Sequence, residues 1–335
     1  MRHNIAKYVV ATALAATLLC AQAQWRDSSP HRIQFVKVDE GVQLEVLDWG
    51  GSGRALVLLA GSGHTAHIFD DFALKLTGLC HVYGITRRGY GASSHTESGY
   101  GAQRLGDDVL AVLDALHLDH AVLAGHSFGG HELTALASGH PNRAAGLIYM
   151  DLTSDPTFDW GPYTELRKKL PHPMAVGYPR ASAEDRRSFQ AYREWQIRTL
   201  GISFPESELR NLYAAKPDGG MGEYQTPVSV RDAITAGMRR PDYSSIRVPV
   251  LAFFTLPAPL ENQIERYRPK TADERAAMEQ VLAADLAWAR RSIDRLKSGA
   301  PASRVVELPG ADHYIFFSNE SDVLLEIRQF VTTLR

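Results

Sequence analysis

Short apolar runs that alternate with helix-like stretches are the feature of this sequence that most limits its fold. Residues 54–60 form such a run, and an uninterrupted apolar run suits a parallel strand covered on both faces. Similar runs occur at residues 80–86, 120–125, 145–150, 248–255 and 304–308. Helical patterns lie between them at residues 66–76, 102–116, 128–138, 271–297 and 322–334. The alternation predicts an α/β fold, with a mostly parallel central sheet flanked by helices.

Two segments fall outside this alternation. Residues 31–38 and 42–49 flank a Glu-Gly turn and predict an antiparallel hairpin that precedes the parallel strands. The alternation then lapses over residues 152–245, where many prolines are scattered among short helical stretches. We expect this segment to be a mainly helical cap, inserted into a core formed by residues 24–151 and 246–335.

The first residues have the layout of an export signal. Basic Arg2 and Lys7 precede an apolar run over residues 8–20, and small side chains follow at Ala21 and Ala23. The pattern predicts a signal peptide over residues 1–23 and a periplasmic or extracellular protein. Because the run is shorter than the roughly 20 residues that cross a bilayer, no stable membrane anchor is expected.

Charge and cysteine content limit the partners. The formal net charge is −2, and removal of Arg2 and Lys7 with the signal peptide makes it more negative. No long Lys/Arg run is present, which argues against nucleic acid as a partner and favours a small-molecule substrate. Cys80 would be the only cysteine after cleavage, and it is predicted to be an inert buried thiol.

The sequence Gly125-His126-Ser127-Phe128-Gly129 directly follows an apolar strand and precedes a helical pattern. In this context a G-x-S-x-G turn pushes the serine hydroxyl above the edge of the sheet. Glycine on both flanks avoids a collision of side chains across the turn. We therefore expect Ser127 to be a catalytic nucleophile.

A serine hydroxyl is a weak nucleophile unless a base accepts its proton, so a partner histidine must lie elsewhere in the chain. His313 is the best placed, because it follows the last predicted strand and precedes the last predicted helix. His126 and His131 are too close in sequence to Ser127 to reach its hydroxyl from the opposite side. His64 is a candidate either for lining the pocket or for a solvated loop.

Together these motifs resemble the α/β-hydrolase superfamily over nearly the whole chain beyond residue 23. The sequence LLAGSG (residues 58–63) follows the third strand and RRGYGAS (residues 87–93) follows the fourth. Ser127 and then His313 come after them, in the order of the family. The resemblance implies a hydrolase with a catalytic acid and an oxyanion hole in addition to these two residues.

The implied oxyanion hole consists of the backbone N–H groups of Ser62 and Phe128. The family's usual His-Gly after the third strand is Ala60-Gly61 here. This departure leaves the hole intact, because backbone donors and not side chains hold the oxyanion.

The acid is harder to assign. It commonly follows the seventh strand of the family, but residues 250–259 contain no carboxylate. Some members carry it after the sixth strand instead, where this chain has Asp151, which preserves the order Ser, Asp, His. Asp155 and Glu261 are alternatives, and Asp151 could instead be a structural residue that ends the strand. Whichever acid serves would hold the imidazole and stabilise its protonated form.

An NADP oxidoreductase is a rival interpretation. Residues 61–66 also satisfy G-x-G-x-x-A, and Arg87 and Arg88 follow the next strand, where they could meet a 2′-phosphate. This interpretation leaves Ser127 and His313 unexplained. It also expects the glycine motif after the first strand, whereas two earlier strands precede it here.

Two further interpretations have less support in the sequence. His131-Glu132 begins a zinc motif, but its second histidine is missing. A ligand-binding protein with negligible turnover is disfavoured by the intact Ser127 and His313. Five aromatic residues are candidates for the walls of a substrate pocket, although cap aromatics more often only pack: Phe128, Phe158, Trp160, Tyr163 and Tyr314.

The sequence thus predicts a serine hydrolase that cleaves carboxylic esters or lactones of small molecules through an acyl-enzyme. Amides, peptides and carbon–carbon bonds are alternative targets of the same residues. A serine at the elbow excludes the dehalogenase and epoxide-hydrolase branches, which resemble this fold but carry Asp there. The mechanism requires no metal and no organic cofactor.

Overall fold

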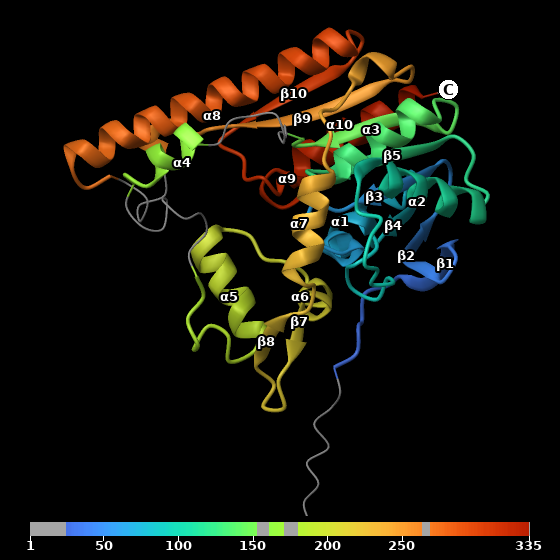
Figure 1. Cartoon of the computed structure of the whole chain (residues 1–335), viewed down its shortest axis with the longest axis horizontal. Helices are drawn as coiled ribbons and strands as arrows, with labels where there is room; N and C mark the ends of the chain where they lie inside the picture. The colour runs from blue at the N-terminus through green and yellow to red at the C-terminus, as the bar shows by residue number, and fades with distance from the viewer. Residues whose placement is uncertain (1–24, 153–160, 171–179, 263–268, 335) are drawn as a thin grey trace, which may run out of the picture.

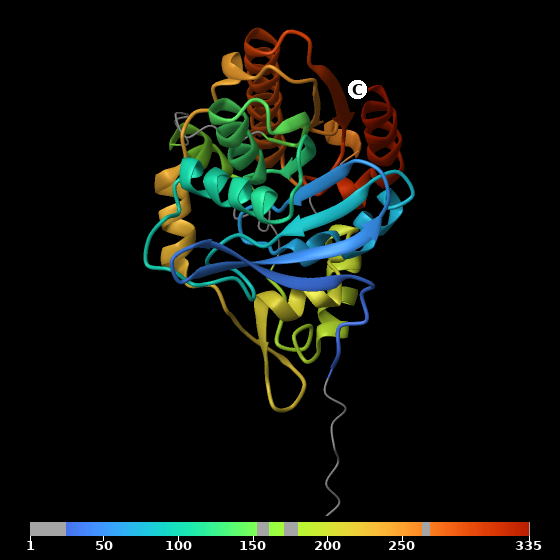
Figure 2. The same cartoon turned by 90° about the vertical axis from the view of Figure 1, so that its right-hand side faces the viewer.

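The computed structural model describes residues 25–152, 161–170, 180–262 and 269–334. Its centre is an eight-stranded sheet in the order β1-β2-β4-β3-β5-β6-β9-β10 (Figures 1 and 2). β1 pairs antiparallel with β2 and β2 antiparallel with β4, whereas the remaining neighbours are parallel. The strands are β1 (Arg32–Asp39), β2 (Val42–Gly51), β3 (Ala55–Leu59), β4 (His81–Ile85), β5 (Ala121–His126), β6 (Ala144–Met150), β9 (Val250–Leu256) and β10 (Arg304–Pro309). The predicted hairpin and the mostly parallel α/β sheet are confirmed.

Helices cover both faces of the sheet, as Figure 2 shows from its β1–β2 edge. One core layer contains residues of α2 (Ala102–Ala115), α3 (Gly129–Gly139) and α8 (Ala272–Gly299). The other contains residues of α1 (Asp70–Ala73), α9 (Ile315–Ser318) and α10 (Glu320–Thr333). Every residue of β5 is buried, with Leu123 in the first layer and Val122 in the second. Burial on both faces explains why the predicted strands are continuous apolar runs and not alternating ones.

The predicted helix over residues 66–76 is wrong as a single element. The chain instead forms η1 (Ala66–Phe69), α1 and η2 (Leu74–Leu76). One 3₁₀ turn thus precedes the short α-helical turn and one follows it. The side chain of Thr65 caps the first turn by accepting a hydrogen bond from the N–H of His67. Because residues three apart are nearly eclipsed in a 3₁₀ turn, His67 and Asp70 lie on one side of it.

Between β6 and β9 the chain leaves the sheet and forms a series of short elements (Figure 1). They are α4 (Gly161–Arg167), α5 (Phe189–Leu200), α6 (Glu206–Leu212), α7 (Val228–Gly237), η4 (Tyr243–Ser245) and the ribbon of β7 (Tyr213–Ala215) with β8 (Met221–Tyr224). We call this the inserted segment. The antiparallel ribbon was not predicted, because its strands are too short to show an apolar pattern.

The predicted signal peptide lies outside the described residues. Among the helices that the structure describes, none combines the length and the apolar character that a membrane span requires. Cys80 is completely buried next to β4, and burial raises the pKa of its thiol to about 11, as expected of an unreactive cysteine.

Candidate active site

Ser127 lies in a left-handed turn between β5 and α3, with a φ of 48°. The structure leaves no room for a side chain at Gly125 or Gly129, the two glycines of the motif. A Cβ on Gly125 would lie 2.5 Å from the carbonyl carbon of Gly129, and one on Gly129 would lie 2.5 Å from the backbone oxygen of Leu59. The chain therefore makes the tight strand–turn–helix that the motif predicts, with a non-glycine residue held in a strained conformation at its apex.

Asp151 occupies the matching position at the end of the next strand, β6. Its φ of 57° is also left-handed, and the Ser127 N–H donates to the backbone oxygen of Met150 across 3.0 Å. Its side chain is buried and accepts hydrogen bonds from the backbone N–H of Thr255 at 2.9 Å and from the Thr255 hydroxyl at 3.0 Å. Thr255 thus fixes the carboxylate through its backbone N–H and its hydroxyl, beside an elbow that is bonded to the end of β6.

His313 lies in the loop between β10 and α9, at the same edge of the sheet. Its Nδ1 is 2.6 Å from Oδ2 of Asp151. Burial opposes the charged form of the ring, but the hydrogen bond and charge of Asp151 outweigh it and raise the pKa of His313 above its ordinary value. This is the arrangement in which a carboxylate orients an imidazole and stabilises its protonated form.

His126 links the His313 loop to the elbow. Its Nε2 lies 3.0 Å from the backbone oxygen of His313, and the two rings are 4.6 Å apart between centroids. Burial and the nearby histidines hold the pKa of His126 well below its ordinary value, so this ring is neutral. Since Ser127 directly follows His126, the sheet edge carries Ser127, Asp151 and His313 on neighbouring segments.

The loop after β3 lies against the elbow. A Cβ on Gly61 would be 3.3 Å from Cβ of Ser127 and 2.9 Å from Nδ1 of His126, so only glycine allows this approach. Ser62 follows it and is exposed. Phe128 caps the N-terminus of α3, where backbone N–H groups have no partner inside the helix. The two segments expected to supply oxyanion donors therefore flank Ser127.

Arg87 holds this loop in place. Its guanidinium donates to the backbone oxygens of Ala60 and of Gly61, the latter across 2.7 Å. It also pairs with Glu132 of α3, with Nε 2.7 Å from Oε1. Arg88 is likewise paired, with Asp108. Neither guanidinium is available for a 2′-phosphate, which removes the structural basis for the NADP interpretation.

A buried polar group on the other side of the loop was not foreseen. His64 Nδ1 lies 2.7 Å from Oε1 of Glu208, a fully buried residue of α6, and His64 Nε2 lies 2.8 Å from the hydroxyl of Tyr314. Thr65 donates both its backbone N–H and its hydroxyl to Glu208. These bonds tie the inserted segment to the loop after β3. Residues separated by more than a hundred positions give no local signal for such a contact.

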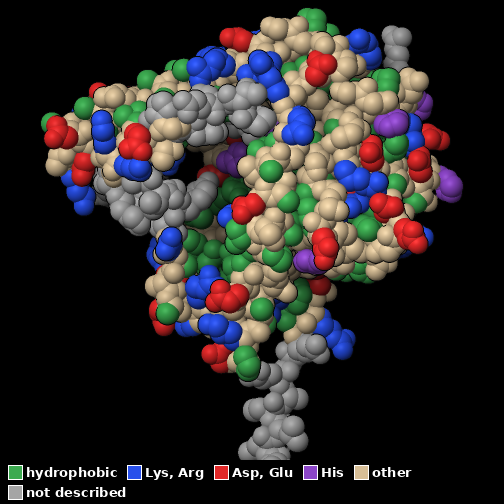
Figure 3. Space-filling model, in the orientation of Figure 1, with side chains coloured by type: hydrophobic (Ala, Val, Ile, Leu, Met, Phe, Trp, Pro, Cys, Tyr) green, Lys and Arg blue, Asp and Glu red, His purple; other side chains and the backbone are tan. Residues whose placement is uncertain are grey.

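Two cavities lie at this edge of the sheet. One, of about 410 Å³, is lined by Asp151 and His313 together with residues of α4 and α8, including Tyr163 and Trp288. The other, of about 460 Å³, lies beside Gly63, and most of its walls are aromatic and aliphatic. Its lining includes His64, Tyr192, Trp195, Phe204, Tyr213, Tyr224 and Tyr314. The space-filling view in Figure 3 shows this face hollowed beside the inserted segment, with histidine atoms inside the hollow.

The other residues considered as the catalytic acid or as pocket walls occupy different positions. Asp155, Phe158 and Trp160 lie outside the described residues. Glu261 is exposed in η5 (Leu260–Asn262), whereas Asp151 is the carboxylate bonded to His313. Phe128 packs in a buried cluster with Tyr90, Leu105 and Val230 of α7 and so is a packing residue.

Comparison with known proteins agrees with this architecture. A sequence model of the alpha/beta hydrolase family matches residues 56–327. A 2-(acetamidomethylene)succinate hydrolase of Mesorhizobium japonicum is 24% identical over 284 residues, which cover 84% of this chain and 89% of the relative. The crystal structure of an E-2-(acetamidomethylene)succinate hydrolase has a TM-score of 0.63 at 21% identity, covering 90% of this chain and 99% of that one.

A second solved structure, an enzyme described as degrading N-acyl homoserine lactones, has a TM-score of 0.51 at 20% identity and covers 89% of this chain and 100% of the other. At these identities the solved structures show a shared fold. The family model covers most of the chain, from β3 into the last helix. This chain belongs to the alpha/beta hydrolase family.

Proposed function

We propose that the protein is a serine hydrolase that cleaves esters or lactones of small molecules. Ser127 is the nucleophile, His313 the general base and Asp151 the acid that orients it. The observation that carries the proposal is the 2.6 Å contact between His313 Nδ1 and Asp151 at the sheet edge that also bears the strained Ser127 turn. This combination matches the roles of nucleophile, base and orienting acid.

The chemistry follows from these roles. His313 Nε2 accepts the hydroxyl proton while Ser127 Oγ bonds to the carbonyl carbon, and the N–H groups of Ser62 and Phe128 hold the resulting oxyanion. The ester C–O bond then breaks, and His313 returns the proton to the leaving alcohol. Water next gives a proton to His313 and attacks the acyl carbon. The bond between that carbon and Ser127 Oγ then breaks, and His313 returns the proton to Oγ, which releases the acid and restores Ser127.

The cavity beside Gly63 supports an apolar acyl or ring group as substrate. Its walls are mainly Tyr, Trp, Phe and Leu side chains, so an alkyl or aryl group would gain free energy by leaving water there. Gly63 and His64 of the loop after β3 line this cavity, so a group bound there would lie beside the loop that we propose holds the oxyanion.

Amide cleavage is a second candidate, favoured by one observation. The relative aligned over 84% of this chain is named a 2-(acetamidomethylene)succinate hydrolase. The same residues can cleave an amide, provided that His313 protonates the departing nitrogen, which is a poorer leaving group than an alkoxide. An enzyme built for amides would also cleave activated esters, so both classes must be tested together.

The test is a panel of aryl esters of graded acyl length, γ- and δ-lactones and N-acetyl enamides, with Ser127→Ala and His313→Ala alongside. Loss of either residue should lower kcat by ~10⁴–10⁶ on every substrate that is turned over. Ser138→Ala on α3 and His95→Ala are matched controls, because both side chains are exposed. Full activity in Ser127→Ala would overturn the proposal.

Export remains a separate proposal that rests on residues 1–23. The expected result is a mature protein that begins at Gln24, found by N-terminal sequencing of the periplasmic or secreted fraction. A chain that keeps residue 1 and stays in the cytosol would contradict it.

A further inference from the structure

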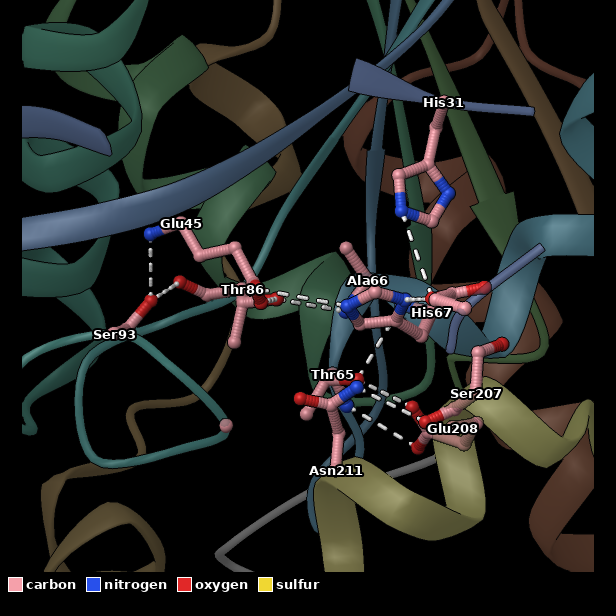
Figure 4. A network of polar contacts seen from close by, with 12 residues as sticks. His31, Glu45, Thr65, Ala66, His67, Thr86, Ser93, Ser207, Glu208 and Asn211 are labelled. Carbon is pink, nitrogen blue, oxygen red and sulfur yellow. Dashed lines mark hydrogen bonds and ion pairs between the residues drawn. The ribbon is translucent and has the colours of Figure 1, made fainter. Parts of the chain in front are cut away.

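Four metal-ligating side chains meet below the loop after β3, outside the catalytic residues. They are Asp27, His31, His67 and Asp70, and one ligand atom from each lies within 4.8 Å of the others. His31, His67 and Asp70 have side chains 2% exposed, and Asp27 closes the group from the N-terminal segment at 21%. Figure 4 shows His31 and His67 entering this group from different segments of the chain.

The spacing of the ligand atoms suits a metal ion. Four atoms held about 2.1 Å from a tetrahedral zinc ion lie about 3.4 Å from one another. His67 Nδ1 lies 3.2 Å from Oδ2 of Asp70 and 3.5 Å from Oδ2 of Asp27, and His31 Nε2 lies 3.7 Å from that same Asp27 oxygen. The two contacts of Asp27 are longer than the usual 2.7–3.2 Å range of hydrogen bonds. His31 Nδ1 and Oδ1 of Asp70 already form a direct hydrogen bond of 2.9 Å, so the atoms that would face an ion are His31 Nε2, His67 Nδ1 and Oδ2 of each aspartate.

A second layer of residues orients the ligands. Behind His67, its Nε2 lies 3.5 Å from Oε1 of Glu45, and the Thr86 hydroxyl donates a hydrogen bond to Oε2 of the same carboxylate across 2.8 Å. Asp70 accepts hydrogen bonds from Trp49 Nε1 at 3.0 Å and from the Ser207 hydroxyl. In proteins, a carboxylate that faces the second ring nitrogen is the usual outer support of a metal-binding histidine.

The charge of these side chains also favours a bound cation. Asp27, Asp70 and Glu45 bring three carboxylates to two imidazoles in a region that is almost closed to water. Positive charge stabilises such carboxylates, and a divalent ion would place it directly between the two aspartates. Two imidazole nitrogens with two carboxylate oxygens form a ligand set suited to Zn²⁺.

We propose that Asp27, His31, His67 and Asp70 bind one structural Zn²⁺ ion. All four coordination positions are filled by the protein, which is typical of a structural and not a catalytic zinc site. The ion would join the N-terminal segment, which leads into β1, to η1 and the first residue of α1. Ser207 of α6 donates a hydrogen bond to Asp70, so the ion would also support the contact between the inserted segment and the loop after β3. The site does not depend on the proposed hydrolase activity.

The experiment uses the untagged chain after dialysis against a chelator. Titration with ZnCl₂ by calorimetry, with zinc counted by mass spectrometry, should give one ion per chain and a Tm that rises with zinc concentration. Asp27→Asn and His31→Ala should each weaken binding by more than ~100-fold, and Glu45→Gln by ~10–100-fold, the usual effect of removing an outer partner.

His81→Ala is the matched control, because His81 pairs with Asp48 on the surface at 2.7 Å and lies outside the group. It should bind zinc as the unaltered chain does. Three results would overturn the proposal: no zinc uptake, uptake that survives both Asp27→Asn and His31→Ala, or a preference for Ca²⁺ over Zn²⁺. Asp27 is the most exposed ligand, so Asp27→Asn decides the question even if the buried variants fail to fold.

Discussion

Arg87 and Glu132 form a buried ion pair in which Arg87 Nε lies 2.7 Å from Oε1 of Glu132. Glu132 belongs to α3, which begins at the elbow, and the same guanidinium donates to the backbone oxygens of Ala60 and Gly61. One side chain therefore fixes the loop that carries Ser62 relative to the helix that follows Ser127.

Replacement of Arg87 by lysine should impair this loop. A lysine ammonium cannot bond to two carbonyls and a carboxylate in the planar pattern of a guanidinium. Loss of a complete oxyanion donor costs ~10²–10³ in rate, so we expect Arg87→Lys to lower kcat by ~10–100-fold with little change in KM. Steady-state kinetics on an aryl ester measure this.

The control is Arg54→Lys, since Arg54 is also bonded to a backbone oxygen, that of His120, at 3.2 Å. That contact lies at the other end of β3, and kcat should stay unchanged. An equal loss in both variants would show that arginine-to-lysine exchange disturbs the fold and not the loop.

The pH dependence of activity should follow Asp151. His313 must be neutral to accept a proton, and Asp151 raises the pKa of His313, so the acid limb of kcat/KM should lie above the ordinary histidine value. Asp151→Asn removes that stabilisation, so the limb should move to lower pH, while kcat falls by about 10⁴-fold.

A pH–rate profile from pH 5 to 9 checks both effects. Glu261→Gln serves as the control, because Glu261 is the exposed alternative acid, and it should shift neither the limb nor kcat. A limb that stays in place in Asp151→Asn, or one that moves in Glu261→Gln, would contradict the assignment.

Much of this site follows from local sequence. The continuous apolar runs predict the strands, and the glycines at 125 and 129 predict the turn at Ser127, because backbone contacts across that turn exclude any Cβ. The strand β9 shows where such reasoning ends. Its expected carboxylate is missing, but Thr255 lies there and donates two hydrogen bonds to Asp151. A threonine at a strand end is unremarkable until the partner strand is in place.

Contacts between distant segments were not predictable for the same reason. His64 and Glu208 are separated by 144 positions, and the carboxylate comes from a short helix among prolines. Likewise Asp27 and His31 meet His67 and Asp70 only in the folded chain, because about forty positions separate the two pairs. Periodicity identifies elements, whereas these groups depend on how the elements pack.

Glu208 should matter for stability more than its place in a short helix suggests. It is fully buried and accepts bonds from the backbone and the side chain of Thr65 while facing His64. In Glu208→Gln one carboxylate oxygen becomes an amide group that cannot accept, so a buried donor loses its partner. We expect a loss of about 1–3 kcal/mol in the free energy of unfolding, measured by urea denaturation.

Glu206→Gln is the matched control on the same helix. Glu206 forms a partly exposed pair with Arg210, one turn away, and such pairs contribute about 0.3–0.5 kcal/mol. The Glu208 variant should also raise KM, because Leu209 and Leu212 of the same helix line the cavity beside Gly63. Equal stability of the two variants would show that the buried bonds contribute nothing net.

The strained turn at Ser127 predicts an unusual order of stability. Both Ser127→Ala and Ser127→Gly lack the hydroxyl and should be inactive. At a φ of 48°, a residue with a Cβ costs roughly 1–2 kcal/mol, whereas glycine adopts this conformation freely. Glycine in turn loses about 0.5–1 kcal/mol more conformational entropy on folding. The strain outweighs that loss, so Ser127→Gly should exceed Ser127→Ala in unfolding free energy by up to about 1.5 kcal/mol.

Ser138 provides the opposite case, because it lies within the helix α3 and is exposed. There Ser138→Gly should be less stable than Ser138→Ala by about 1 kcal/mol, the helix propensity difference. Urea denaturation of the four variants measures both differences. If glycine were the less stable replacement at both positions, the Ser127 turn would store no strain. A reversal of sign between two positions of one strand–helix unit would show that the nucleophile is held at a cost in stability.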